Sequence, residues 1–278
     1  MSQDFHQFAA AHGLIIAHVE QGRWVRCGTE DKPSKRNGGY FHGGDYASII
    51  NWATMTEHVT WFPDKPMNEI DRADMQKRME ASHKAYAKER GIKQVIAAKK
   101  AKWILQQTEL DFHAYLSGKG FPEMLGNVWR RPEQDPLLVI PMFYNAAICG
   151  CQLIGTAGEK KFLSGQRTND ATFTIGQTGR AFIVEGYASA LSLNAILAAA
   201  KVPATIYTTF SVGNASRLAR RCPAAFWIAD NDVSGVGQKA AAESGLKWWM
   251  PPVTGTDVND YHQAVGLFKA SQILRKQL

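Results

Sequence analysis

The clearest alternation of hydrophobic and polar segments lies in the last hundred residues of the chain. Short, uninterrupted apolar runs there predict buried strands, and the stretches between them predict helices. We expect strands at 181–184, 205–208, 225–229 and 247–250, and helices at 187–200, in a short stretch through Arg217, at 238–244 and at 261–275. Continuous apolar strands separated by helices favour a parallel sheet covered on both faces.

Shorter elements are predicted within residues 111–178. A helix there is expected to end near Gly118, and the apolar runs at 137–142 and 148–154 are expected to form paired strands. A basic segment with an aromatic residue inside it, 158–165, is interpreted as a turn. This region is therefore expected to be a small α+β subdomain.

The N-terminal part combines a small β-containing module with a charged helix. Strands are expected at 24–26 and 39–42, and a helix from about Asp71 to Gln107. The part of this helix from Lys84 to Lys102 contains seven basic residues but only one acidic residue, Glu89. They are Lys84, Lys88, Arg90, Lys93, Lys99, Lys100 and Lys102. Such a run is typical of a solvated connector, or alternatively of a helix that follows a phosphate backbone.

These changes of pattern divide the chain into four predicted segments. They are an N-terminal module at 1–65, a charged helical connector at 66–110, a basic subdomain at 111–178 and a parallel-sheet domain at 179–278. The sequence shows neither an internal repeat nor a low-complexity tract.

The composition excludes several classes of protein. Of the 278 residues 45% are apolar and 21% are charged, so the chain can bury a core and is not expected to be disordered. No apolar run approaches the roughly 20 residues of a membrane span, and no signal peptide is recognisable. Four cysteines do not make a disulfide framework in a chain this long. We therefore expect a reduced, cytoplasmic protein without a membrane partner.

The charge adds two observations. Residues 136–278 contain 13 Lys and Arg but only 8 Asp and Glu, an excess that favours polyanionic partners or simply solubility. Five of those 8 acidic residues directly follow predicted strands or lie in the loop after one. They are Glu185, Asp230, Asp232, Asp257 and Asp260. Because parallel strands end at the same edge of a sheet, these carboxyl groups are expected to lie together.

A cluster of carboxylates has a specific chemical requirement. Like charges repel, so the cluster needs either raised pKa values or a bound cation. Carboxylate oxygens without His or Cys partners suit Mg²⁺ or Mn²⁺, and the reaction class that follows is metal-assisted phosphoryl transfer. The alternative is that Asp230 and Asp232 only cap the following helix and that Glu185 caps its own.

Two of these strand ends resemble the motifs of Toprim domains. The segment IVEGYASA at 183–190 is similar to their glutamate-glycine motif, and IADNDVSG at 228–235 is similar to their aspartate-x-aspartate motif. TDVNDY at 256–261 resembles the acidic segment that follows in phage and plasmid primases. The resemblance implies a C-terminal α/β Toprim domain at 179–278 with a parallel, Rossmann-like sheet.

The region before this domain resembles the basic subdomain of bacterial-type primases. YLSGKGF at 115–121 is similar to their "YL-x-x-RG" segment, and KKFL at 160–163 is similar to the lysine-aromatic turn that lines their template and nucleotide cleft. Toprim topoisomerases and nucleases lack this subdomain. The resemblance, over about 111–278, therefore implies a DNA primase of the phage or plasmid type.

The resemblance also implies roles for individual residues. The catalytic residues would be Glu185, Asp230 and Asp232. The same three would bind Mg²⁺ or Mn²⁺, with Asp257 or Asp260 completing the ligands. Contacts to nucleic acid or nucleotides would come from Lys119, Lys160, Lys161 and Arg167.

The activity so implied is that of a primase-type DNA-directed RNA polymerase, a nucleotidyltransferase. It would make short RNA primers on single-stranded DNA from ribonucleoside triphosphates. The chain has no Gly-x-x-x-x-Gly-Lys-Ser/Thr motif, so a separate replicative helicase is the expected partner. A Toprim nuclease and a non-catalytic nucleic-acid-binding replication accessory protein are the alternatives.

The N-terminal module departs from the primase pattern. Primases of this kind usually begin with a zinc ribbon that has paired Cys-x-x-Cys ligands. Residues 1–65 contain one cysteine, Cys27, with His12, His18 and His42 at other spacings, so no zinc is expected. One interpretation is that 26–34 are a metal-free remnant of that ribbon. Cys149 and Cys151 are expected to pack in the core.

Overall fold

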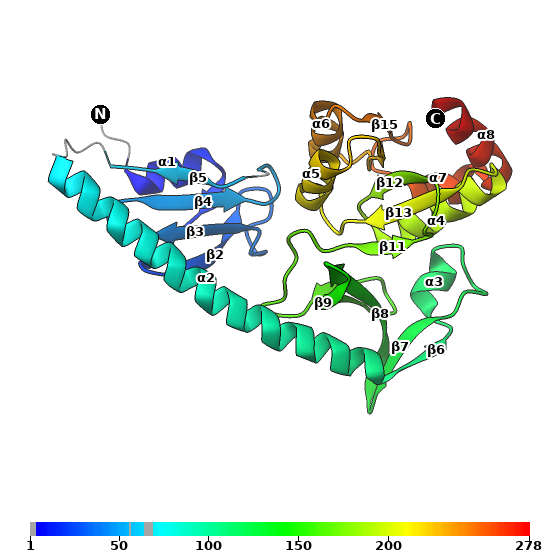
Figure 1. The fold of residues 1–278 in the computed structure, drawn as a ribbon, viewed down its shortest axis with the longest axis horizontal. Coiled ribbons are helices and arrows are strands. Elements are labelled where there is room, and N and C mark those ends of the chain that lie inside the picture. Colours follow the sequence, from blue (N-terminus) through cyan, green and yellow to red (C-terminus); the bar gives the residue numbers. More distant parts are fainter. Residues whose placement is uncertain (1–3, 56, 64–68) are drawn as a thin grey trace. The chain divides into compact units, whose positions relative to one another are not determined.

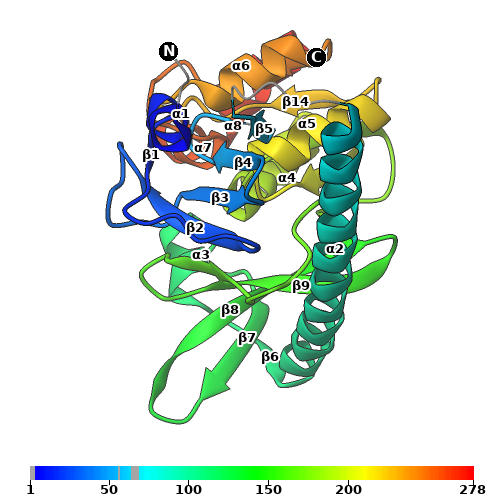
Figure 2. The same cartoon turned by 90° about the vertical axis from the view of Figure 1, so that its left-hand side faces the viewer.

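The computed structural model describes residues 4–55, 57–63 and 69–278 (Figure 1). The chain divides into two compact units, Met1–Gly91 and Ile92–Leu278. The dividing point lies inside helix α2 (Glu69–Gln106), which is a single continuous helix in Figures 1 and 2. This helix covers most of the predicted connector; the first residues of that prediction, 66–68, lie outside the described residues.

The first unit contains the predicted β-containing module. Its strands are β1 (Leu14–Ile15), β2 (Trp24–Thr29), β3 (Gly38–His42), β4 (Ala47–Asn51) and β5 (Val59–Trp61), and they pair in that order in one antiparallel sheet. Helix α1 (Phe5–Ala11) contributes Phe5 and Ala9 to a core that includes Tyr40, Ile49 and the buried thiol of Cys27.

The second unit begins with an antiparallel sheet in the order β10-β9-β8-β7-β6. Its elements are β6 (Thr108–Asp111), helix α3 (Ala114–Gly118), β7 (Gly126–Arg131), β8 (Gln134–Tyr144), β9 (Ala147–Ile154) and β10 (Lys160–Phe162). The predicted pairing of 137–142 with 148–154 is confirmed. The predicted turn at 158–165 is wrong, because Lys160–Phe162 pair with β9 as a strand. All three of its residues are exposed, so the strand has no apolar pattern to reveal it.

A second sheet of this unit has the order β11-β13-β12-β14-β15. Its strands are β11 (Phe173–Ile175), β12 (Arg180–Val184), β13 (Ala204–Thr208), β14 (Phe226–Ile228) and β15 (Lys247–Trp249). The predicted strands β12 to β15 are all present and pair in parallel. The edge strand β11, which was not predicted, pairs antiparallel with β13.

Helices cover both faces of this sheet, as the apolar strands predicted. They are α4 (Tyr187–Ala199), α5 (Val212–Arg221), α6 (Val236–Glu243), α7 (Val258–Val265) and α8 (Leu267–Gln277). Alternating side chains of β12 separate the two cores: Phe182 packs with α4, α7 and α8, whereas Ile183 packs with α5 and α6. The single helix predicted at 261–275 is wrong, since Gly266, with φ of 77°, separates α7 from α8.

A shared apolar core joins the two sheets of the second unit. Leu116 of α3 and Ile140 of β8 pack in one cluster with Tyr187 and Leu191 of α4. The end of α2 packs on the opposite face of the antiparallel sheet β10-β9-β8-β7-β6, where Ile104 belongs to the same cluster as Val139 of β8. No helix in the described part of the chain is both long and apolar enough to cross a membrane.

Candidate active site

Glu185 directly follows β12 and is held in place through its backbone. The carbonyl of Val184 accepts a hydrogen bond from the Thr209 amide at 2.9 Å, and the carbonyl of Glu185 accepts one from the Phe210 amide at 2.9 Å. These bonds extend the pairing of β12 with β13 beyond the strands themselves. Glu185 does not cap α4, because Gly186 is the N-cap residue and no side chain caps that helix end.

Asp230 follows the neighbouring parallel strand, β14, and the loop beside it is fixed by Asn231. The Asn231 amide donates to the carbonyl of Thr256 at 3.1 Å, and its side chain donates to the carbonyl of Pro251 at 2.9 Å. Asn231 is only 7% exposed, so these bonds are formed inside the protein. They bring the loop that ends at Asp257 alongside Asp230.

Asp232 is exposed and takes part in the turn that starts α6. Its Oδ1 accepts hydrogen bonds from the Ser234 hydroxyl at 2.5 Å and from the Gly235 amide at 3.0 Å. Gly235 adopts a positive φ of 66° immediately before the helix. Asp232 therefore stabilises the turn before α6 but does not cap the helix, because Gly235 is the N-cap residue and no side chain caps that end. Its second carboxylate oxygen takes no part in these bonds.

Asp257 and Asp260 form a capping box at the start of α7. Oδ1 of Asp257 accepts from the amides of Asn259 and Asp260, and Oδ2 of Asp260 accepts from the amide of Asp257. Between them, the fully buried Asn259 donates to the carbonyl of Lys119 at 2.8 Å and to the Ser192 hydroxyl at 2.9 Å. The capping box is thereby tied to α4 and to the end of α3.

The carboxyl groups at the strand ends lie close enough to affect one another electrostatically. Burial is the main cause that raises the pKa of Glu185, and the charge of Asp232 raises it further. Burial raises the pKa of Asp230 to about 8, with additional contributions from Glu185, Asp257 and Asp232. Lys160 lowers both pKa values. The structure thus brings together four of the five predicted acidic residues and one predicted lysine.

The remaining predicted residues have different surroundings. Lys119 lies 3.7 Å from Oδ1 of Asp260, at the edge of the cluster. Lys161 follows Lys160 on β10, and consecutive strand residues point to opposite faces. Arg167 has its guanidinium 3.5 Å above the ring of Tyr144 and is not among the groups that shift the pKa values of the acidic cluster.

Two further features belong to this site, although the sequence pattern assigned them no role. One is the pair of buried asparagines that place its loops, Asn231 and Asn259. The other is the hydroxyl of Tyr115, which is buried and has no hydrogen-bond partner among the described residues. Burial and the nearby Asp257 raise the pKa of this hydroxyl, and the ammonium of Lys160 lies 5.8 Å from the Tyr115 ring. The sequence did contain a signal for the two asparagines, because each is a polar residue that stands between two acidic residues.

A metal ion at this acidic cluster would have few protein ligands. Among the described residues, no three Asp, Glu, His or Cys side chains are arranged to ligate one ion. However, no protein group in the described chain donates a hydrogen bond to the partly buried carboxyl groups of Glu185 and Asp230. Mg²⁺ commonly uses only one or two carboxylates and completes its shell with water and substrate phosphates. The residues present therefore fit a magnesium ion that is bound together with a phosphate-containing substrate.

A comparison with models of known protein families and with curated protein sequences finds no match for this chain.

Proposed function

We propose that this protein is a DNA primase, which makes short RNA primers on single-stranded DNA by metal-dependent nucleotidyl transfer. One observation supports this proposal above the others. Glu185 and Asp230 follow adjacent parallel strands and are partly buried without protein donors. Burial raises the pKa of both carboxyl groups, and the charge of Glu185 raises that of Asp230 further. Carboxylates in this state favour a divalent cation and the triphosphate that binds with it.

In this proposal residues 179–278 are a Toprim-type domain, and 111–178 are the basic subdomain of a bacterial-type primase. Glu185, Asp230 and Asp232 would hold Mg²⁺ or Mn²⁺, with Asp257 or Asp260 as a further ligand. When bound, the ion would neutralise charge on the triphosphate. A separate helicase would supply the single-stranded template.

The protein side chains have two tasks of their own. Glu185 is suited to accept the proton of an attacking 3′-hydroxyl, because burial and the nearby Asp232 raise its pKa and so make its carboxylate a stronger base. Lys160 is exposed and lies beside the same carboxyl groups, where its charge can hold a phosphate. Positive charge next to an acidic metal cluster is the arrangement that binding of a nucleoside triphosphate requires.

The proposal is tested by incubating the protein with single-stranded DNA, Mg²⁺ and labelled ribonucleoside triphosphates. We expect short labelled RNA oligomers that do not form when EDTA replaces Mg²⁺. Shortened DNA without labelled product would instead identify a Toprim nuclease. A mobility shift with neither product would identify a nucleic-acid-binding accessory protein.

Replacement of Lys160 by Ala is expected to weaken binding of single-stranded DNA or of nucleotide by about tenfold. Each phosphate contact that is lost also lowers the slope of log affinity against log salt, by about 0.7 for a single strand. The matched control is Lys161→Ala, which removes the same charge from the neighbouring position on β10. Equal effects of the two substitutions would show that general surface charge, and not the position of Lys160, determines binding.

A further inference from the structure

A cavity lies in the same unit as the acidic cluster but uses none of its residues. It has a volume of about 580 Å³ and lies between the tip of the β8–β9 hairpin, the segment that leads into β11, and the end of α5. The hairpin is fixed to that segment by two hydrogen bonds between Phe143 and Thr172, of 2.8 and 2.9 Å. The cavity is therefore built from elements that are tied together.

The walls of this cavity offer both aromatic rings and charge. The lining residues include the aromatic residues Phe143, Tyr144 and Tyr207 and the basic residue Arg221. The guanidinium of Arg167 stacks on Tyr144 at 3.5 Å, which holds that ring in place from one side. Aromatic rings beside a guanidinium are the combination that binds a base and its phosphate.

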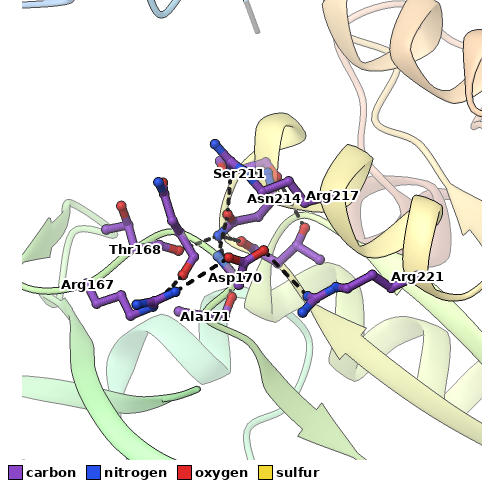
Figure 3. Close-up of polar contacts among 10 residues, drawn as sticks. Arg167, Thr168, Asp170, Ala171, Ser211, Asn214, Arg217 and Arg221 are labelled. Carbon is purple, nitrogen blue, oxygen red and sulfur yellow. Dashed lines mark hydrogen bonds and ion pairs between the residues drawn. The ribbon is translucent and has the colours of Figure 1, made fainter. Parts of the chain in front are cut away.

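One carboxylate is shared between two arginines at this site. Oδ2 of Asp170 lies 3.6 Å from Arg167 and Oδ1 lies 3.6 Å from Arg221, which approach it from opposite sides in Figure 3. Arg217 and Arg220 lie on the same helix as Arg221, so the local charge is positive. The side chain of Arg221 is 52% exposed and can contact an anion without leaving a buried position.

The position of Asp170 is fixed by a buried asparagine. Asn214 is 3% exposed; it accepts a hydrogen bond from the Asp170 amide at 3.0 Å and donates to the carbonyls of Thr168 and Thr209 (Figure 3). Asp170 has a positive φ of 60°, a conformation that Asp and Asn adopt more readily than most other residues. The bond from its amide to Asn214 fixes this backbone position and thereby places its carboxylate at the cavity.

We propose that this cavity binds a nucleotide, with the base against the ring of Tyr144 or Tyr207 and the phosphate on Arg221. Asp170 would accept a hydrogen bond from an amino group of the base or a hydroxyl of the sugar. A volume of this size is within the range of small-molecule sites and suits one nucleotide. The nucleotide is either a free nucleoside phosphate or one unit of a single strand. The site goes beyond the proposed primase activity and does not depend on it.

Calorimetric titration of the full-length protein in EDTA tests the site. Without a metal ion the acidic cluster repels phosphates, so binding there is suppressed. We expect ATP to bind, Arg221→Ala to weaken it about tenfold, and Arg220→Ala, the matched control outside the cavity, to change it less than twofold. Tyr144→Leu should weaken the binding of ATP but not that of inorganic triphosphate.

A short oligothymidylate distinguishes the two sources of the nucleotide. Binding of the oligomer but not of ATP, with the same selective loss in Arg221→Ala, would assign the site to single-stranded nucleic acid. The proposal is overturned if neither ligand binds in EDTA, or if Arg220→Ala and Arg221→Ala have equal effects. It is also overturned if inorganic triphosphate binds as tightly as ATP.

Discussion

Replacing Glu185 with Gln is expected to abolish primer synthesis, with a loss of at least about a hundredfold, and to leave the affinity for single-stranded DNA nearly unchanged. The amide has almost the same shape as the carboxyl group, but it can neither accept a proton nor hold a cation with a full charge. The basic residues proposed to contact phosphates are untouched. Primer yield and a DNA-binding titration on the same preparation measure the two effects, and Asp230→Asn should behave in the same way.

The control for this substitution is Glu243→Gln. Glu243 is an exposed carboxylate on α6 whose one ion pair among the described residues is with Lys239, at 3.9 Å, so its loss should leave synthesis unaffected. Synthesis at the wild-type rate by Glu185→Gln would remove Glu185 from the catalytic role. A parallel loss of DNA binding would show that the substitution had damaged the fold or the binding surface instead.

The stability of the metal-free protein is expected to decrease as the pH rises from about 4 to about 8. Burial raises the pKa of Asp230 to about 8 in the folded protein, whereas an unfolded Asp has a pKa near 3.9. Between these values the folded state binds more protons than the unfolded state, so the free energy of unfolding falls as the pH rises. The expected loss is on the order of a few kcal/mol, and Glu185 acts in the same direction.

Asp230→Asn should remove much of this dependence, because the amide does not ionise. Thermal unfolding midpoints in EDTA at pH 5 and pH 8 give the comparison: the variant should be more stable than wild type at pH 8 and similar at pH 5. Asp135→Asn, at an exposed position, is the control. Identical pH profiles for wild type and Asp230→Asn would show that ionisation of Asp230 does not destabilise the folded protein. Mg²⁺ at pH 8 should raise the midpoint of wild type more than that of the variant.

Much of the sheet that positions the acidic residues was predictable from the sequence. Continuous apolar runs marked the strands β12 to β15, because strands buried on both faces need apolar residues at every position. Elements without that signal were missed. The strand β10 is fully exposed, and β11 is a three-residue edge strand. Gly266 separates two helices that have continuous helical periodicity on either side.

By itself the sequence determined that acidic residues follow the strands. It also predicted that these residues lie at one edge of the sheet, because parallel strands end at the same edge. Only the tertiary structure decided which side chains meet there. Asp257 comes beside Asp230 because Asn231 bonds the intervening loop, and Lys160 joins them from a different sheet. Arg167, only seven residues after Lys160, stacks on Tyr144 instead. Apolar periodicity reflects local burial, whereas these contacts join residues far apart in the chain, which a one-dimensional pattern does not encode.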